Sequence, residues 1–276
     1  PGGLLDAAVA ISAAFLPKDV TVVTTNGQIA ESKATFRASP SDYMRRPGSD
    51  PLARLPAALK KVPLVVLVNE GSASASEIVA GALQDHKRAT IMGSQTFGKG
   101  SVQTVRPLGP DTGLKITIAR YYTPHGKSIQ ATGIVPDVML DETEGGNLYS
   151  ALREREADLE KHITNGQQDE KPDPEREKQR EEALKKLEEA SKADPKSVRL
   201  PEFGSEKDFP LIQALNKLKG LPVIASKTQK VRPAEKDEKD EKAETAADDK
   251  TSNSDQEKSK GKVKQPAKPA SQPTKP

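Results

Sequence analysis

Three serines lie in a short turn that connects an apolar stretch to a helical pattern. The apolar stretch Pro63–Val68 has the length and β-branched content of a strand buried on both faces. The turn Asn69–Ser76 follows, and apolar residues then recur at three- and four-residue spacing from Ile78 to Leu83. Because the first N–H groups of a helix have no partner inside it, they can stabilise developing negative charge. The turn is therefore a suitable place for a nucleophilic serine.

A lysine that could act as a base follows in the same stretch. Lys99 lies between Gly98 and Gly100, and these glycines allow the backbone to turn sharply and approach other groups closely. An uncharged lysine amine can take the proton of a hydroxyl group. Residue types alone favour a plainer alternative, in which Lys99 is a solvated turn residue and the serines cap the helix.

Several short motifs within residues 1–140 carry a family resemblance. They are PGGLLDAAV at 1–9, GSASASEI at 71–78, AGALQD at 80–85, TFGKG at 96–100 with Val102–Gln103, YTPHGKSI at 122–129 and GIVPD at 133–137. Together they closely resemble the carboxyl-terminal processing proteases, also called tail-specific proteases. The resemblance implies an α/β fold with a serine protease core related to the ClpP/crotonase fold, of which this chain holds a part.

The resemblance implies catalytic roles for three side chains. Ser74, the middle serine of its triplet, matches the nucleophile, and Lys99 matches the general base. Gln103 matches the family glutamine that hydrogen-bonds the lysine and orients it. The serine would attack a peptide carbonyl while the lysine takes its proton, and water would then hydrolyse the acyl-enzyme. Since the amine must be uncharged to act, we expect activity to rise toward alkaline pH.

Two backbone N–H groups are expected to stabilise the oxyanion of such a reaction. The resemblance implies that Ala75 supplies one and that the Gly2–Gly3 turn supplies the other. Asp85 matches a family aspartate that we interpret as support for the architecture of the site. The mechanism calls for no metal and no other cofactor, and the absence of cysteine excludes disulfides and thiolate ligands.

Other residues offer alternative roles. Ser72 and Ser76 are competing nucleophiles, and we expect one of them to cap the helix with Glu77 nearby. The three histidines could supply the base of a Ser-His-Asp triad instead of Lys99. We disfavour this because His86 lies among charged residues at a helix end and His162 lies in a charged segment; the third is His125.

The composition indicates that only part of the chain forms a core. Hydrophobic residues make up 34% and aromatic residues 3%, and the mean hydropathy is −0.68, which is low for 276 packed residues. We predict a partial serine protease catalytic domain at 1–140, a charged helical region at 141–225 and a disordered Lys/Glu/Pro-rich tail at 226–276. Helical patterns in the middle region span Arg176–Ser191 and Asp208–Gly220.

Periodic segments elsewhere in residues 1–140 predict the scaffold of the site. They are a helix at Leu4–Phe15, a strand at Val20–Thr25, a two-residue turn at Asn26–Gly27 with a returning strand at Ile29–Arg37, and strands at Arg88–Gly93 and Leu114–Tyr122.

Three classes of function stay open. The first is a serine endopeptidase that uses a Ser/Lys dyad to cleave proteins at or from their C-terminal region. The second is a crotonase-like acyl-CoA enzyme, which would hold a thioester oxyanion on backbone N–H groups without the Ser74–Lys99 pair. The third is a non-catalytic interaction module, for which the long charged tail is the indication.

The resemblance also implies partners and a location. Substrates would be proteins or peptides, with a homo-oligomer or an activating adaptor protein as further partners. The net charge of +3, from 43 basic and 40 acidic residues, gives no indication of nucleic acid. We expect a bacterial periplasmic or cell-envelope location. Because the sequence opens at Pro1 inside a motif and shows no signal segment, we interpret it as a fragment from which the family's PDZ domain and N-terminal anchor are absent.

Overall fold

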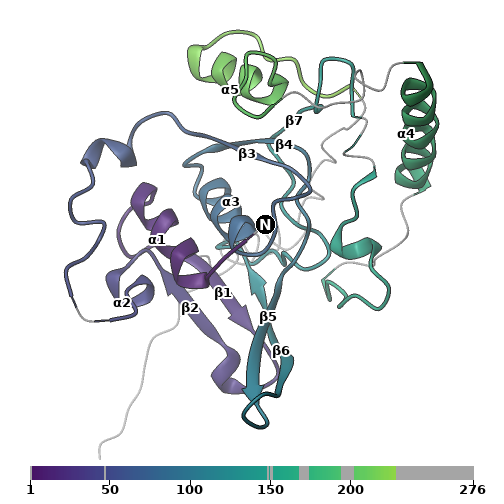
Figure 1. Ribbon diagram of the computed structural model, residues 1–276. Coiled ribbons are helices and arrows are strands. Elements are labelled where there is room, and N and C mark those ends of the chain that lie inside the picture. Colours follow the sequence, from purple (N-terminus) through teal and green to yellow (C-terminus); the bar gives the residue numbers. More distant parts are fainter. Residues whose placement is uncertain are drawn as a thin grey trace, which may run out of the picture. The chain divides into compact units, whose positions relative to one another are not determined.

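Two β-sheets and a small set of helices form the fold in the computed structural model (Figure 1). The structure describes residues 2–46, 48–147, 149, 152–167, 174–193 and 202–227. Apart from Ser226 and Lys227, the tail predicted at 226–276 lies outside these ranges. Within them, no helix combines the length and apolar character needed to cross a bilayer.

The larger sheet is antiparallel and has the strand order β2-β1-β6-β5. The smaller sheet is parallel and has the order β3-β4-β7. The strand bounds are Thr21–Asn26 for β1, Ala34–Arg37 for β2, Val65–Val68 for β3, Thr90–Gly93 for β4, Ser101–Pro107 for β5, Gly113–Tyr122 for β6 and Val138–Met139 for β7. This arrangement confirms the predicted mixed α/β class.

Helices α1, α3 and α5 pack against the sheets. The helix bounds are Leu5–Phe15 for α1, Pro40–Tyr43 for α2, Ala75–Asp85 for α3, Pro174–Ala193 for α4 and Phe209–Lys219 for α5, with 3-10 turns at Ala30–Ser32, Ala57–Lys60 and Glu156–Asp158. Helices α1 and α3 pack side by side, and α5 packs against β3 and β4 (Figure 1). The predicted helices at Leu4–Phe15, Arg176–Ser191 and Asp208–Gly220 are confirmed as α1, α4 and α5.

One hydrophobic core lies between α1, α3 and β1. Val9, Val22 and Ile91 are completely buried in it, and Ile78 of α3 is 2% exposed. Since α3 begins directly after the serine-rich turn, this packing fixes the start of the helix relative to both sheets.

The expected burial of Pro63–Val68 on both faces is wrong. β3 is the edge strand of the parallel sheet, and Leu67 is 39% exposed. An apolar run alone does not distinguish an edge strand from a central one.

The predicted two-residue hairpin at Asn26–Gly27 is also wrong. A longer connection that contains the 3-10 turn Ala30–Ser32 joins β1 to β2, and β2 begins only at Ala34. The side chain of Thr25 stabilises this connection, because its hydroxyl donates to the Ser32 carbonyl at 2.8 Å and accepts from the Ala34 N–H at 3.1 Å.

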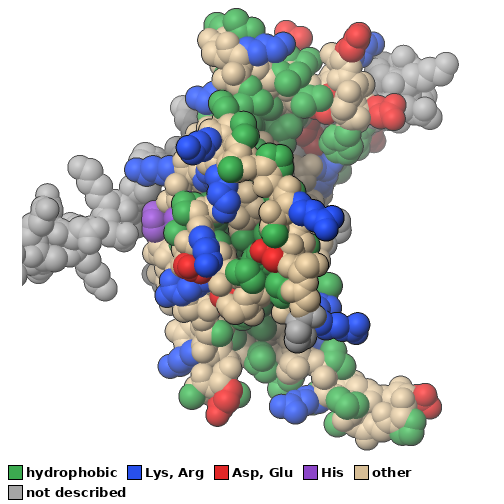
Figure 2. Space-filling model, turned by 90° about the vertical axis from the view of Figure 1, so that its left-hand side faces the viewer, with side chains coloured by type: hydrophobic (Ala, Val, Ile, Leu, Met, Phe, Trp, Pro, Cys, Tyr) green, Lys and Arg blue, Asp and Glu red, His purple; other side chains and the backbone are tan. Residues whose placement is uncertain are grey.

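Apolar side chains remain exposed on and beyond α5. They are Ile212, Leu215, Leu218, Leu221 and Ile224. Figure 2 shows hydrophobic side chains gathered at the top of the view, at the level that α5 occupies in Figure 1.

Candidate active site

The turn between β3 and α3 gives Ser74 an unusual backbone conformation. Ser74 is the N-cap of α3, with φ 56° and ψ −115°. Residues without glycine's freedom adopt such a conformation only where the surroundings enforce it, and sharp strand–turn–helix connections of this kind present nucleophilic serines in other enzymes. The expectation that Ser72 or Ser76 caps the helix is therefore wrong.

The two neighbouring serines bind the backbone around them. The Ser72 hydroxyl accepts from the Asn69 N–H at 3.2 Å, which closes the turn on itself. The Ser76 hydroxyl accepts from the Gly2 N–H at 3.3 Å, which ties the Gly2–Gly3 turn to α3. Both hydroxyls thus accept hydrogen bonds from backbone N–H groups.

A buried carboxylate joins the turn Asn69–Ser76 to the backbone of Lys99. Glu77 is completely buried, and its Oε2 accepts from the Ser74 N–H at 2.7 Å and from the Lys99 N–H at 2.9 Å. Its Oε1 accepts from the Gly98 N–H at 2.6 Å and from the Thr96 hydroxyl at 2.5 Å. Burial raises the pKa of Glu77, and these hydrogen bonds oppose the rise in part. The backbones of Ser74 and Lys99 therefore meet on one oxygen atom.

Residues Gln95–Gly100, called the lysine loop below, are held tightly at their backbone. The Phe97 N–H donates to the Ser72 carbonyl at 3.0 Å, and the Ala131 N–H donates to the Gly98 carbonyl at 2.8 Å. A Cβ atom at Gly100 would lie 2.2 Å from the Gln130 nitrogen, so only glycine fits there. Within the described ranges the Lys99 amine has no hydrogen-bond or ion-pair partner, and its side chain is half-buried.

Gln103 contacts the neighbouring strand β6. It is exposed on β5, and its Nε2 atom is 3.5 Å from the Thr117 hydroxyl on β6. The register of β5 and β6 shifts between Val102 and Gln103, a bulge that changes the direction of the side chain. A hydrogen bond from Gln103 to Lys99 is not among those formed by the described residues.

The proposed oxyanion donors lie next to Ser74. Gly2 has φ 70°, and a Cβ atom there would lie 3.1 Å from the Ser74 Cβ and 3.6 Å from the Ala75 nitrogen. The backbone of the Gly2–Gly3 turn thus approaches the first residue of α3 directly beside the serine. Ala75, Gly2 and Ser74 are brought together, as the sequence motifs imply.

Asp85 supports the loop at the far end of α3. Its side chain is 7% exposed and accepts from the His125 N–H at 2.8 Å, with the His125 ring nitrogen 3.5 Å away. Because α3 has 11 residues and is therefore about 16 Å long, this Asp–His pair cannot reach Ser74. His86 contacts the Thr21 carbonyl at the same end. This geometry disfavours the triad alternative.

Sequence reasoning missed the roles of two buried side chains. Glu77 was expected only near a helix cap, although it also binds the lysine loop. Gln130 is completely buried, and its Oε1 accepts from the Gly100 N–H at 3.1 Å. No periodicity indicates these long-range contacts, since the partners are 22 and 30 residues away in sequence.

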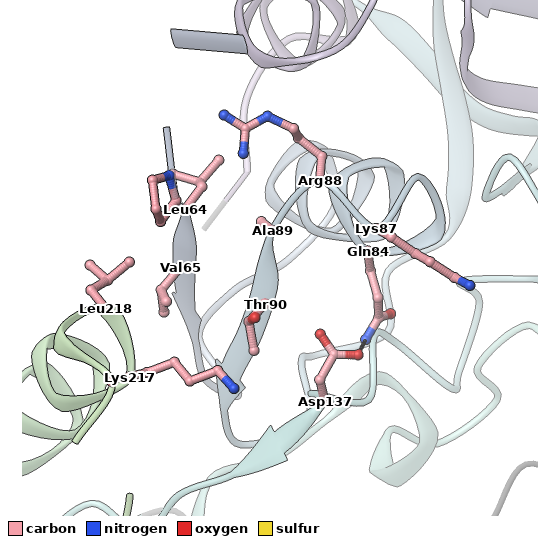
Figure 3. A pocket seen from close by; sticks show the side chains of 12 residues that line it. Leu64, Val65, Gln84, Lys87, Arg88, Ala89, Thr90, Asp137, Lys217 and Leu218 are labelled. Carbon is pink, nitrogen blue, oxygen red and sulfur yellow. Dashed lines mark hydrogen bonds between the residues drawn. The ribbon is translucent and has the colours of Figure 1, made fainter. Parts of the chain in front are cut away.

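A separate cavity of about 610 Å³ lies away from these residues. Figure 3 shows Gln84 and Asp137 hydrogen-bonded to each other at one side of it and α5 at the other. The guanidinium of Arg88, which also lines it, donates to the Phe15 and Leu59 carbonyls. In the described part of the chain, no cluster of three or more His, Cys, Asp or Glu residues could hold a metal ion.

The chain thus combines a mixed α/β fold with a strained serine at the start of α3. The model of peptidase family S41 matches residues 1–140, half of the chain, and the chain belongs to this family. It is 49% identical over 142 residues to a carboxy-terminal-processing protease of Bartonella bacilliformis, covering 51% of this chain and 29% of the relative. It is 42% identical over 142 residues to a carboxyl-terminal-processing protease of Synechocystis, with the same coverage.

A solved structure is also similar to about half of the chain. It is the photosystem II D1 C-terminal processing protease, at 39% identity, with a TM-score of 0.40, covering 51% of this chain and 32% of that one. The chain therefore spans less than a third of the length of each of these three relatives.

Proposed function

We propose that this chain carries the catalytic residues of a serine endopeptidase that cleaves proteins at or from their C-terminal region, on a core related to the ClpP/crotonase fold. The observation that carries the proposal is the Glu77 carboxylate, which binds the backbones of Ser74 and Lys99 on one oxygen. A nucleophile and a base must be held together before a Ser/Lys dyad can act. Family membership gives the reaction class, hydrolysis of peptide bonds.

In this mechanism the Lys99 amine takes the proton of the Ser74 hydroxyl as its oxygen attacks the peptide carbonyl. The N–H groups of Ala75 and of the Gly2–Gly3 turn stabilise the tetrahedral oxyanion. The Lys99 ammonium then gives its proton to the leaving amine, which leaves an ester on Ser74. Lys99 next takes a proton from water, whose oxygen attacks the ester, and the proton returns to Ser74 as the acid is released.

Gln103 has the role of orienting the Lys99 amine in this proposal. In this proposal its side chain turns from Thr117 toward the lysine. Catalytic hydrogen bonds often form only in the substrate complex.

The substrate class follows from the names of the relatives, which are carboxyl-terminal processing proteases. Protein or peptide C-termini are accordingly the proposed substrates, with a homo-oligomer or an adaptor protein as a further partner. The bacterial periplasm or cell envelope stays the predicted location.

A fluorophosphonate probe tests the nucleophile in the purified protein. We expect covalent labelling at Ser74 and its loss, with a fall on the order of 10⁶-fold in hydrolysis, in Ser74→Ala. Ser72→Ala is the matched control, because it removes a neighbouring hydroxyl from the same turn, and it should keep most labelling. Labelling of Ser74→Ala equal to that of the unmodified protein would exclude the dyad and favour the acyl-CoA or interaction alternatives.

A further inference from the structure

The segment 152–167, called the strap below, packs against the lysine loop from outside the part of the chain that the family model matches. It contains the 3-10 turn Glu156–Asp158 and, within 152–167, neither an α-helix nor a strand. Its Glu156 N–H donates to the Phe97 carbonyl at 3.0 Å. The lysine loop is thus bound by Glu77 on one side and by the strap on another.

Arg155 makes the most direct side-chain contact of the strap with this loop. Its guanidinium donates to the Gln95 Oε1 at 2.9 Å and to the Thr132 and Ala131 carbonyls at 3.2 and 3.4 Å. A guanidinium is planar and always charged, so several such hydrogen bonds fix both its own position and that of its partners. Arg155 therefore joins Gln95, the first residue of the lysine loop, to Ala131 and Thr132, and Ala131 packs against Gly98 of the same loop.

The buried Gln130 carries a second connection. Its Oε1 accepts from the Gly100 N–H, while its Nε2 donates to the Glu156 carboxylate at 3.0 Å and to the Ile163 carbonyl at 2.9 Å. Asn165 donates to the Gln130 carbonyl at 2.8 Å. The last residue of the lysine loop thus reaches the strap through one side chain.

Arg153 connects the strap to the nucleophile turn. Its guanidinium lies 3.4 Å from the carboxylate of Glu70, in the turn Asn69–Ser76, and 3.4 Å from that of Glu142. The side chains of these two glutamates are only 5% and 11% exposed. A buried carboxylate is costly unless it is paired or hydrogen-bonded, so this contact constrains the turn. Two arginines of one short segment therefore hold the two halves of the site.

We propose that the strap positions the lysine loop against the nucleophile turn and that Arg155 is a positioning residue for the reaction. This inference rests on the proposed function. Gly98 and Gly100 have no side chains that could anchor the loop, so its position depends on contacts to its backbone and to Gln95. A base displaced by about 1 Å can lower a rate about 100-fold. The contacts of Arg155 and Gln130 limit that movement at both ends of the loop.

Arg155→Met tests the proposal, because it removes the guanidinium and keeps a long side chain. We expect kcat for peptide hydrolysis to fall about 10- to 100-fold with KM nearly unchanged. Arg155→Lys, which keeps one charge and can reach one carbonyl, should recover part of the loss. Arg37→Met is the control, since Arg37 also donates to a carbonyl, that of Asp19, but lies away from the loop.

Amide hydrogen exchange gives a readout that does not depend on activity. Exchange in a peptide covering residues 95–103 should become faster in Arg155→Met, while exchange in a peptide covering 21–26 should not change. Gln95→Ala removes the same contact from the opposite side, together with the hydrogen bond from the Gln95 Nε2 to the Thr132 carbonyl at 2.7 Å. Because both single variants lose the Arg155–Gln95 contact, the double variant should lose less kcat than the product of the two single losses.

The outcomes separate the two proposals. Unchanged kcat and unchanged exchange at 95–103 in Arg155→Met would overturn the positioning role. An additive loss in the double variant would also overturn it. If Arg155→Met fails to fold, kcat and amide exchange at 95–103 in Gln95→Ala decide the question. Hydrolysis that persists in Ser74→Ala would instead overturn the proposed function, whatever Arg155→Met shows.

Discussion

Ser74 stores backbone strain at the position proposed for the nucleophile. A serine at φ 56° and ψ −115° costs about 1–3 kcal/mol relative to an ordinary conformation. The strain persists because Glu77 binds the Ser74 N–H and because Gly2 packs against the turn. The fold is therefore less stable than it could be because it presents the Ser74 hydroxyl at the start of α3.

Glycine at this position should relieve the strain. We expect Ser74→Gly to be about 1 kcal/mol more stable than Ser74→Ala, because the relief exceeds the 0.5–1 kcal/mol or so that glycine costs in backbone entropy. Urea unfolding of both variants measures the difference. At Ser72, which has no positive φ, the glycine variant should be the less stable one, and the same order at both positions would contradict the strain argument.

Glu77 should make stability depend on pH in a defined direction. The pKa of Glu77 is raised above the ordinary value of 4.5, chiefly by burial. Between pH 4.5 and this raised pKa, the folded protein therefore keeps a proton that the unfolded chain releases. The contribution of Glu77 to stability is therefore full below pH 4.5 and is lost as the pH rises through the folded pKa. Glu77→Gln has no such titration.

The free energy of unfolding of the unmodified protein should accordingly exceed that of Glu77→Gln by the largest amount at the acid end of this pH range. We expect a difference of about 1–3 kcal/mol there, because an amide would direct an NH2 group at two N–H donors. Urea unfolding at a series of pH values measures it, with Glu31→Gln, an exposed position, as the control. A difference that grows with rising pH would contradict the raised pKa of Glu77.

Among the elements, the lysine loop keeps its conformation through the tight packing around Gly100 as much as through hydrogen bonds. Gly100→Ala would place a Cβ atom 2.2 Å from the Gln130 nitrogen and 2.7 Å from its Cα atom, both backbone atoms. We expect it to cost about 1–3 kcal/mol of stability and to slow fluorophosphonate labelling of Ser74. Gly145→Ala, where the nearest atom is 3.6 Å away, should change neither. Equal labelling rates in the two variants would show that the loop tolerates displacement.

Local patterns were sufficient for part of this scaffold. The 3.6-residue period predicts α1 and α5, and the motifs around Ser74 and Lys99 indicate the two segments that Glu77 brings together. The connection from β1 to β2 was not predictable, because a Cβ atom at Gly27 would lie 2.1 Å from the Ile118 carbonyl oxygen. That glycine is required by β6, a strand far away in sequence, and not by a two-residue turn.

The strap was not predictable from the sequence for a related reason. Arg153 and Arg155 lie in a charged stretch without periodicity, and such charges are usually solvated. Their partners Glu70 and Gln95 are 83 and 60 residues away. Only the folded chain shows that these side chains have structural partners.

For the molecule as a whole, the C-terminal helix is part of the same folded unit as the site. α5 packs on β3 and β4, and the chain beyond it returns to β7, where the Ser226 N–H donates to the Met139 carbonyl at 2.7 Å. Ser226 also donates its hydroxyl to Asp141 at 2.5 Å. Because β3 leads directly into the nucleophile turn, a loss of α5 would uncover the strand that positions Ser74.

A charge placed beneath α5 tests this dependence. Ala214 is 5% exposed, and we expect Ala214→Glu to cost about 1–3 kcal/mol, since the carboxylate would be buried without a partner or would displace the helix from β3. Leu215→Glu adds the same charge to the next residue, which is 42% exposed, and should change stability little. Urea unfolding compares the two, and exchange at 65–76 reports on β3 and the turn. Equal stability of both variants would mean that the docking of α5 contributes nothing to the fold around Ser74.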